Sequence, residues 1–215
     1  MSVPQTQLPA ARHMLRLTGK RILDVCGASV GLILLLVPMM LVAAAIRLTS
    51  PGPALFRQRR VGKCGRVFVL YKFRSMYKDS LERRPEVAEM NHLGLDSITF
   101  KIPRDPRITP IGRWLRKSSV DELPQLWNVL TGDMSLVGPR PPLPEEVVRY
   151  TSEQRHRLDT LPGLTGLAQV SGRADLPFDQ QVQLDLYYLQ HGNLQLDFRI
   201  LLETVPAVVS ARGAY

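Results

Sequence analysis

The longest uninterrupted apolar run in the chain covers residues 25–46 and contains no charged side chain. A run of roughly 20 residues is the length that crosses the hydrocarbon core of a bilayer as a helix. It is too long for the apolar part of a cleaved signal peptide, and no small-residue cleavage site precedes a mature start. The pattern predicts a tail over residues 1–19, a membrane helix over residues 20–50 and a cytoplasmic domain over residues 51–215.

Two features favour a re-entrant helix over a simple transmembrane span. Pro38 lies near the middle of the run, where it removes a backbone hydrogen bond and kinks or breaks a helix. Basic residues flank the run on both sides, and positive charge tends to stay in the cytoplasm. They are Arg12, Arg16, Lys20 and Arg21 before it and Arg47, Arg57, Arg59, Arg60, Lys63 and Arg66 after it. A plain span remains the alternative, but we favour a hairpin that breaks at Pro38 and returns to the cytoplasmic face.

The segment after the apolar run has the pattern of a small β-hairpin. Residues 54–58 and 67–73 read as strands, joined through Gly62 and Gly65 at a basic tip. Residues 79–97 are polar and mixed in charge, which is typical of a solvated helix and loop. After several prolines, the pattern turns helical at residues 111–116.

Two amphipathic patterns follow near the end of the chain, over residues 177–190 and 198–210. Their apolar side chains recur at helical spacing and are Leu184, Tyr187 and Tyr188 in the first and Phe198, Leu201, Leu202, Val205 and Val209 in the second. Such stripes either face a core or lie flat in the membrane interface. The patterns together predict a helix-rich α+β monotopic membrane protein with a re-entrant hairpin, a small β-hairpin and amphipathic interfacial helices.

Charge and cysteine content narrow the class of partner. The net charge of +9 over 215 residues favours anionic partners such as lipid headgroups, phosphorylated substrates or nucleic acid. Nucleic acid is disfavoured because the basic residues flank the apolar run and the acids described below, instead of clustering with aromatic residues. Cys26 and Cys64 have no metal-ligand spacing, so we interpret them as reduced thiols of a cytoplasmic protein.

Candidate chemistry is concentrated in "SSVDELPQLWNVLTGDMSLVGPRP", where Asp121 and Glu122 are adjacent acids followed by Pro124. In one register Ser119 and Glu122 form a capping box at a helix start. In the other, Asp121 is the N-cap, and its carboxylate lies beside free backbone N–H groups that also bind phosphate. Both acids could also have only a capping role.

The same segment adds Asp133 and Arg140, and arginine suits bidentate phosphate contact. Of two adjacent acids, one can act as nucleophile or metal ligand while the other moves a proton. Acids, arginines and a membrane anchor together suggest phosphoryl transfer with a divalent cation and a lipid-linked partner.

This segment, with "LYKFRSM" upstream and "LPGLTGLAQVSGR" downstream, closely resembles the bacterial sugar transferase family. These are monotopic polyprenyl-phosphate phosphoglycosyl transferases that start exopolysaccharide, O-antigen and glycoprotein glycan assembly. The resemblance extends from about Lys20 to the C-terminus. "FKIPRDPRITPIGRWLRK" is more similar to the hexose-1-phosphate transferases of exopolysaccharide pathways, and we expect this chain to lack the N-terminal membrane bundle of larger members.

The resemblance implies transfer of a sugar-1-phosphate from a UDP-sugar to undecaprenyl phosphate at the cytoplasmic face of the bacterial inner membrane, with release of UMP. Asp121 resembles the nucleophile that takes the phosphosugar and touches Mg²⁺, and Glu122 resembles its partner in proton removal. Further residues resemble positions that bind phosphate or substrate: Lys72, Arg116, Arg140, Arg173 and Asp197. The lone Asp197 could also be a helix N-cap.

A non-catalytic membrane scaffold for other glycan enzymes is the rival interpretation, and it makes no demand on Asp121, Glu122 or Arg140. A homodimer is also credible for a protein with helices on the membrane surface. Because sugar contacts depend on loop shape, the sequence selects no particular hexose.

Overall fold

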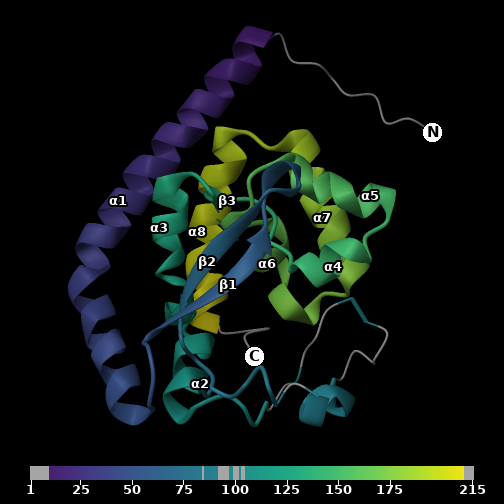
Figure 1. The fold of residues 1–215 in the computed structure, drawn as a ribbon. Coiled ribbons are helices and arrows are strands. Elements are labelled where there is room, and N and C mark those ends of the chain that lie inside the picture. Colours follow the sequence, from purple (N-terminus) through teal and green to yellow (C-terminus); the bar gives the residue numbers. More distant parts are fainter. Residues whose placement is uncertain (1–9, 84, 92–96, 99–101, 103–104, 211–215) are drawn as a thin grey trace.

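The computed structural model describes residues 10–210 apart from residues 84, 92–96, 99–101 and 103–104. One long helix, α1 (Ala10–Thr49), lies along one side of a helix-rich α+β domain (Figure 1). The predicted tail over residues 1–19 lies partly outside the described residues, and α1 begins before the predicted start at residue 20. In the described part of the chain, α1 is the one helix long and apolar enough to cross a membrane.

Helix α1 continues through Pro38, so the predicted break into two arms at this residue is not present. The missing hydrogen bond at a proline is one interaction among many in a helix of 40 residues. Its outward side is apolar and exposed at Ile33, Leu34, Met40 and Leu41. The structure therefore has a long apolar helix, and a re-entrant course remains a prediction.

Two parts of α1 pack against the domain, one around Asp24 and one around Ile46. Near its start, Asp24 accepts hydrogen bonds from the Ser135 hydroxyl (2.9 Å) and the Leu136 amide (2.8 Å). Near its end, the buried Ile46 packs in a cluster with Phe73 and Leu115. These contacts fix the helix along the length of the domain.

The predicted β-hairpin is confirmed. Strands β1 (Leu55–Val61) and β2 (Val67–Phe73) pair antiparallel, from Leu55 opposite Phe73 to Val61 opposite Val67. The hairpin crosses the front of the domain in Figure 1, and Asn128 of α3 (Gln125–Thr131) connects α3 to strand β2. The Asn128 side chain accepts from the Tyr71 amide (3.1 Å) and donates to the Val69 carbonyl (2.7 Å).

A second sheet, which the sequence pattern does not reveal, consists of two short parallel strands, β3 (Ser135–Val137) and β4 (Gly163–Thr165). The main core lies between these strands, the hairpin, α1, α3 and the last helices. Its buried residues are Ala28, Phe68, Leu70, Leu126, Val129, Met134, Leu136, Val137, Tyr188 and Ile200.

Helix α2 (Pro110–Lys117) covers the end of α1 and confirms the helix predicted at residues 111–116. The predicted solvated helix over residues 79–97 is a short 3₁₀ helix, η2 (Pro85–Met90), with turns in the described part of that range. The remaining elements are η1 (Lys63–Gly65), η3 (Val120–Glu122), α4 (Pro144–Val148), α5 (Ser152–Arg155), η4 (His156–Asp159), α6 (Leu167–Ser171), η5 (Arg173–Asp175), α7 (Phe178–His191) and α8 (Leu194–Ser210).

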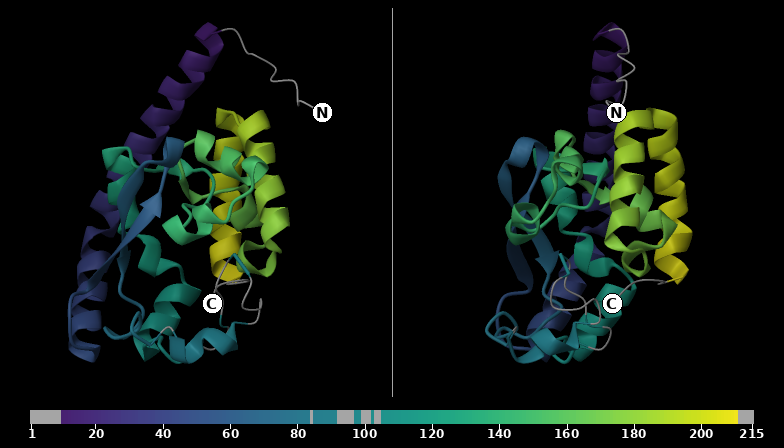
Figure 2. Two further views of the ribbon diagram at one scale, coloured as in Figure 1. Left: turned by 45° about the vertical axis from the view of Figure 1, so that its right-hand side comes forward. Right: turned by 90° about the vertical axis from the view of Figure 1, so that its right-hand side faces the viewer.

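Helices α7 and α8 lie side by side, as both views of Figure 2 show, and confirm the two C-terminal helical patterns. In α7, Tyr188 is a core residue, whereas Tyr187 is exposed. In α8 an apolar row is exposed and consists of Phe198, Leu202, Val205 and Val209. The α7 stripe is thus divided between core and surface, while the α8 row has the exposure that an interfacial helix needs.

Candidate active site

The adjacent acids lie in a 3₁₀ turn, η3, that precedes α3. Ser119 has a left-handed backbone conformation (φ 57°) and no capping side-chain hydrogen bond, so the predicted capping box is wrong. Asp121 is inside the turn, and Pro124 is the residue before α3, so the predicted N-cap role of Asp121 is wrong as well. The turn presents both acids to a cavity instead of using them as caps.

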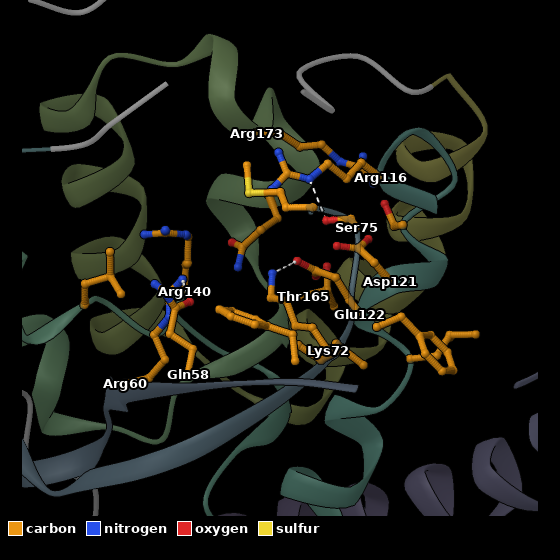
Figure 3. A pocket seen from close by; sticks show the side chains of 18 of the residues that line it. Gln58, Arg60, Lys72, Ser75, Arg116, Asp121, Glu122, Arg140, Thr165 and Arg173 are labelled. Atoms are coloured by element: carbon orange, nitrogen blue, oxygen red, sulfur yellow. Dashed lines mark hydrogen bonds and ion pairs between the residues drawn. The ribbon is translucent and has the colours of Figure 1, made fainter. Parts of the chain in front are cut away.

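This cavity has a volume of about 940 Å³ and opens between the hairpin, η3, the turn after β3 and the C-terminal helices. Figure 3 shows its charged lining, with Asp121 and Glu122 on one side and Arg60 and Arg140 on the other. The cavity is large enough for a nucleotide sugar, because small-molecule sites are commonly 300–1,000 Å³. Six predicted residues line it: Lys72, Arg116, Asp121, Glu122, Arg140 and Arg173.

The two acids differ in environment although they are neighbours in sequence. Asp121 is 7% exposed, and burial raises the pKa of its carboxyl group to about 6, with Glu122 adding repulsion while Lys72 and Arg116 oppose the shift. Glu122, whose side chain is 38% exposed, forms an ion pair of 2.8 Å with Lys72. Desolvation acts to raise the pKa of the Glu122 carboxyl group, but the Lys72 cation outweighs it and the pKa is lowered. Asp121 makes no ion pair with any described residue, which leaves its carboxylate available for chemistry.

Arg116 lies above the acids and is oriented by Ser75. Its Nε donates to the Ser75 hydroxyl at 3.0 Å. Ser75 can approach because Gly112 in α2 has no side chain, whereas a Cβ atom there would overlap the Ser75 carbonyl. Arg116 also lies close enough to Asp121 for each charge to affect the other's pKa.

Arg140 follows β3 and is held by Glu146 of α4. Its Nη1 contacts Glu146 Oε2 at 3.3 Å, and the Glu146 side chain is 4% exposed. Arg173 lies near Arg116 in Figure 3, at the start of η5, and has a left-handed backbone conformation (φ 53°). Both guanidinium groups favour the ionised form of Glu122.

Sequence reasoning missed three cavity residues, Gln58, Arg60 and Ser75. Arg60 appeared only as a basic flank of the apolar run. The alternation of side chains along β1 could have distinguished Arg60 from its basic neighbours. Gln58 and Arg60 lie on the cavity side of the strand, while Arg57 and Arg59 are exposed.

Comparison with known proteins gives the family of the chain. The model of the bacterial sugar transferase family matches residues 15–211. The chain belongs to this family. The predicted resemblance is therefore confirmed.

Several curated relatives are similar to this chain. It is 44% identical over 199 residues to galactosyl transferase CpsE of Streptococcus agalactiae serotype III, covering 92% of this chain and 44% of that protein. It is 43% identical over 206 residues to the UDP-glucose:undecaprenyl-phosphate glucose-1-phosphate transferase of Caulobacter vibrioides, covering 91% of this chain and 72% of that protein. The exopolysaccharide production protein ExoY of Rhizobium meliloti is 40% identical over 198 residues, covering 91% and 88%. The chain thus spans less than half the length of some relatives, CpsE among them.

Two acids predicted or noted near the site do not line the cavity. Asp197 in α8 is 1% exposed and contacts Lys20 (3.0 Å) and the Tyr188 hydroxyl (2.6 Å). It is neither a cavity residue nor the N-cap of α8, which begins at Leu194. Asp133 accepts from the Thr131 hydroxyl (3.3 Å) at the end of α3. The predicted substrate-binding role of Asp197 has no support in this arrangement.

A divalent cation fits the oxygen donors of the cavity. Mg²⁺ prefers oxygen ligands and often binds through one or two carboxylates together with substrate phosphates. Asp121 is a cavity carboxylate without an ion-pair partner among the described residues, and Glu122 is beside it. The described residues contain no cluster of three acid, histidine or cysteine side chains, so substrate oxygens would complete the coordination.

Proposed function

We propose that this protein transfers a sugar-1-phosphate from a UDP-sugar to undecaprenyl phosphate and releases UMP, the first membrane step of exopolysaccharide or O-antigen type glycan synthesis. The observation that carries the proposal is a single cavity in which Asp121 and Glu122 face Lys72, Arg116, Arg140 and Arg173. Four cations suit a diphosphate donor, because arginine and lysine are the usual phosphate ligands. The names of several relatives, which include undecaprenyl-phosphate hexose-1-phosphate transferases, support the same reaction class.

In the first step, an Asp121 carboxylate oxygen attacks the phosphorus bonded to the sugar. The new oxygen–phosphorus bond replaces the bond to the bridging oxygen of the diphosphate, which leaves with UMP. No proton moves, because the carboxylate attacks in its ionised form. Arg116 lies beside Asp121 and is placed to stabilise charge on the transferred phosphoryl group.

In the second step, a phosphate oxygen of the lipid attacks the same phosphorus, and the Asp121 carboxylate departs. The product is a polyprenyl diphosphate sugar, and the enzyme returns to its starting state. If the acceptor arrives with a proton, Glu122 can take it, since Lys72 keeps this carboxyl group ionised. Splitting the transfer into two displacements predicts ping-pong kinetics.

Mg²⁺ would be held by Asp121 and Glu122 together with donor phosphate oxygens. When bound, it would neutralise negative charge that the donor brings toward two carboxylates. The residues of the chain then orient the donor from the other sides of the cavity, with Lys72 and Arg140 on different walls.

The lipid acceptor fits the apolar side of the same cavity. Leu164, Leu201 and Val205 line it, and Val205 also belongs to the exposed apolar row of α8. An isoprenoid chain could pass from membrane to cavity along this surface without exposing its carbons to water. Together with α1, this surface supports a place on the cytoplasmic face of the bacterial inner membrane.

The test is UMP release from a panel of UDP-sugars by the protein in membranes, with and without undecaprenyl phosphate. We expect one donor to give turnover that EDTA abolishes and Mg²⁺ or Mn²⁺ restores. Donor alone should give a phosphosugar adduct on Asp121 in intact-mass spectra. Asp121→Asn should lose adduct and turnover, because an amide is a poor nucleophile, while Glu122→Gln should mainly slow turnover.

Full turnover in chelator would remove the metal from the proposal. Substantial turnover by Asp121→Asn, or an adduct on another residue, would refute the nucleophile. A protein that releases no UMP with any donor would instead be the non-catalytic scaffold.

A further inference from the structure

Arg60 is a buried cation without a carboxylate partner among the described residues. It is 7% exposed, and its guanidinium donates only to neutral oxygens of Gln58 (2.8 Å from Nη2) and Pro141 (3.0 Å from Nη1). A buried charge with no counterion is costly to the folded protein. The side chain lines the cavity, so an anion bound there would supply the missing charge.

Arg140 increases this imbalance. Burial and then repulsion by Arg140 lower the pKa of Arg60 to about 9, which still leaves it protonated at neutral pH. Glu146 is the carboxylate that opposes this shift most, with smaller effects of Glu122 and Glu145. Glu146 itself contacts Arg140 and accepts from the Leu143 amide at 2.8 Å, so its charge is shared between the two guanidinium groups.

Two other cavity arginines have partners away from Arg60. Arg157 has an ion pair with Asp185 (2.6 Å) and donates to the Tyr150 hydroxyl (2.9 Å). Arg116 is bonded to Ser75 beside Asp121, on the opposite side of the cavity from Arg60 (Figure 3). Arg60 and Arg140 thus form a separate positive end of the cavity, facing the acids.

We propose that Arg60 and Arg140 form one phosphate subsite, which first holds the departing phosphate of UMP and then the phosphate of the lipid acceptor. This inference rests on the proposed two-step transfer. In a displacement at phosphorus, the entering and leaving oxygens lie roughly in line. The phosphate of UMP and the phosphate of the acceptor must therefore occupy the same position in the cavity. UMP leaves opposite Asp121 in the first step, and the acceptor enters opposite Asp121 in the second.

The test compares Arg60→Gln with Arg59→Gln, a matched control on the exposed side of the same strand. Adduct formation is followed from the UDP-sugar alone by intact mass. Discharge of the isolated adduct is then followed after addition of undecaprenyl phosphate, or of UMP to reverse the first step. We expect Arg60→Gln to slow all three reactions by about 10- to 100-fold, the effect of losing a charge-assisted hydrogen bond. Arg59→Gln should match the wild type.

A second measurement tests the subsite without turnover. Calorimetric titration with UMP should give a dissociation constant about 10- to 100-fold higher for Arg60→Gln than for the control. If Arg60→Gln does not fold, Arg60→Lys replaces it, and we expect weaker UMP binding because an ammonium group lacks the bidentate fork. UMP should also compete with undecaprenyl phosphate for the adduct.

Slowing of only adduct formation, or of only discharge by the acceptor, would overturn the shared subsite. Wild-type rates or unchanged UMP affinity in the Arg60 variant would overturn the subsite altogether. Failure of the proposed function is distinguishable, since the wild type would then form no adduct with any donor. The UMP titration would still decide whether Arg60 binds phosphate.

Discussion

The pKa of Asp121 is set by opposing effects, and the result suits a nucleophile. Burial and Glu122 favour its protonated form, while Lys72 and Arg116 favour the carboxylate. With a pKa of about 6, the group is mostly ionised at neutral pH and more basic than an ordinary aspartate. A more basic oxygen attacks phosphorus more readily, whereas an acid with a still higher pKa would be protonated too often.

The pH dependence of adduct formation follows from this balance. Below pH 6 Asp121 is protonated and cannot attack, so the rate at limiting donor should rise through about pH 6 and level off above it. The measurement is the initial rate of adduct formation without acceptor between pH 4.5 and 8. Lys72→Met should shift the midpoint to higher pH, because Lys72 is the largest effect that lowers this pKa. A midpoint near 4, or a downward shift in Lys72→Met, would contradict the assignment.

At this scale, motif residues could be predicted because the motif keeps them close in sequence. Asp121, Glu122 and Arg140 belong to one segment, and the structure brings Lys72 to them across the hairpin. Arg60 belongs to a basic stretch whose composition does not show which residue faces the cavity. Only the alternation of side chains along β1 places Arg60 on the cavity side. Asp197 was misplaced because a lone acid near a helix start has the same pattern whether it faces a cavity or, as here, a buried lysine.

At the scale of elements, α1 depends on polar contacts that its apolar pattern does not indicate. Lys20 donates to Asp197 (3.0 Å), to the Tyr188 hydroxyl (3.0 Å) and to the Val137 carbonyl (3.0 Å). Arg21 donates to the last carbonyls of α3, at Val129 (2.7 Å) and Leu130 (2.8 Å). A long apolar helix is thereby fixed to the domain by its charged start.

The Lys20–Asp197 pair gives a stability prediction for this attachment. Lys20→Met should lower the unfolding free energy by about 3–5 kcal/mol, because it leaves Asp197 buried and unpaired. Combining it with Asp197→Leu should cost less than the sum of the two single changes. Arg199→Met is the matched control, since its pair with Glu203 is exposed and should contribute little. Denaturant unfolding in detergent measures all four, and additive effects would contradict a coupled buried pair.

Elements with a local pattern could be predicted, and those defined by distant partners could not. The hairpin and α2 follow from alternation, turns and helical spacing in their own residues. Strands β3 and β4 have three residues each and pair across a gap of more than twenty residues, so no local signal marks them. The predicted break at Pro38 is wrong because the packing of α1 against the domain outweighs the one hydrogen bond that the proline removes. This packing depends on distant residues and has no signal in the local sequence.

For the whole molecule, the packing of α1 constrains its relation to the membrane. Lys20 and Ile46 both contact the domain, although about 39 Å of helix separates them at 1.5 Å per residue. This distance exceeds the roughly 30 Å of a bilayer core. If α1 crossed the bilayer upright with these contacts intact, the charged domain beside it would lie in hydrocarbon, which is prohibitively costly. A helix embedded from one side, with both ends cytoplasmic, avoids this cost.

Cysteine labelling in intact cells tests that topology. The native thiols Cys26 and Cys64, which are free and exposed, are first replaced by serine. Single cysteines at positions 12 and 57 should then react only with reagents that enter the cytoplasm, because a helix embedded from one side leaves both flanks of the apolar run in the cytoplasm. A cysteine at Ile33, on the exposed apolar face, should react poorly with either reagent if lipid covers it. Labelling of position 12 or position 57 from the periplasm would show that α1 crosses the membrane, and the domain contacts at one of its ends would then have to break.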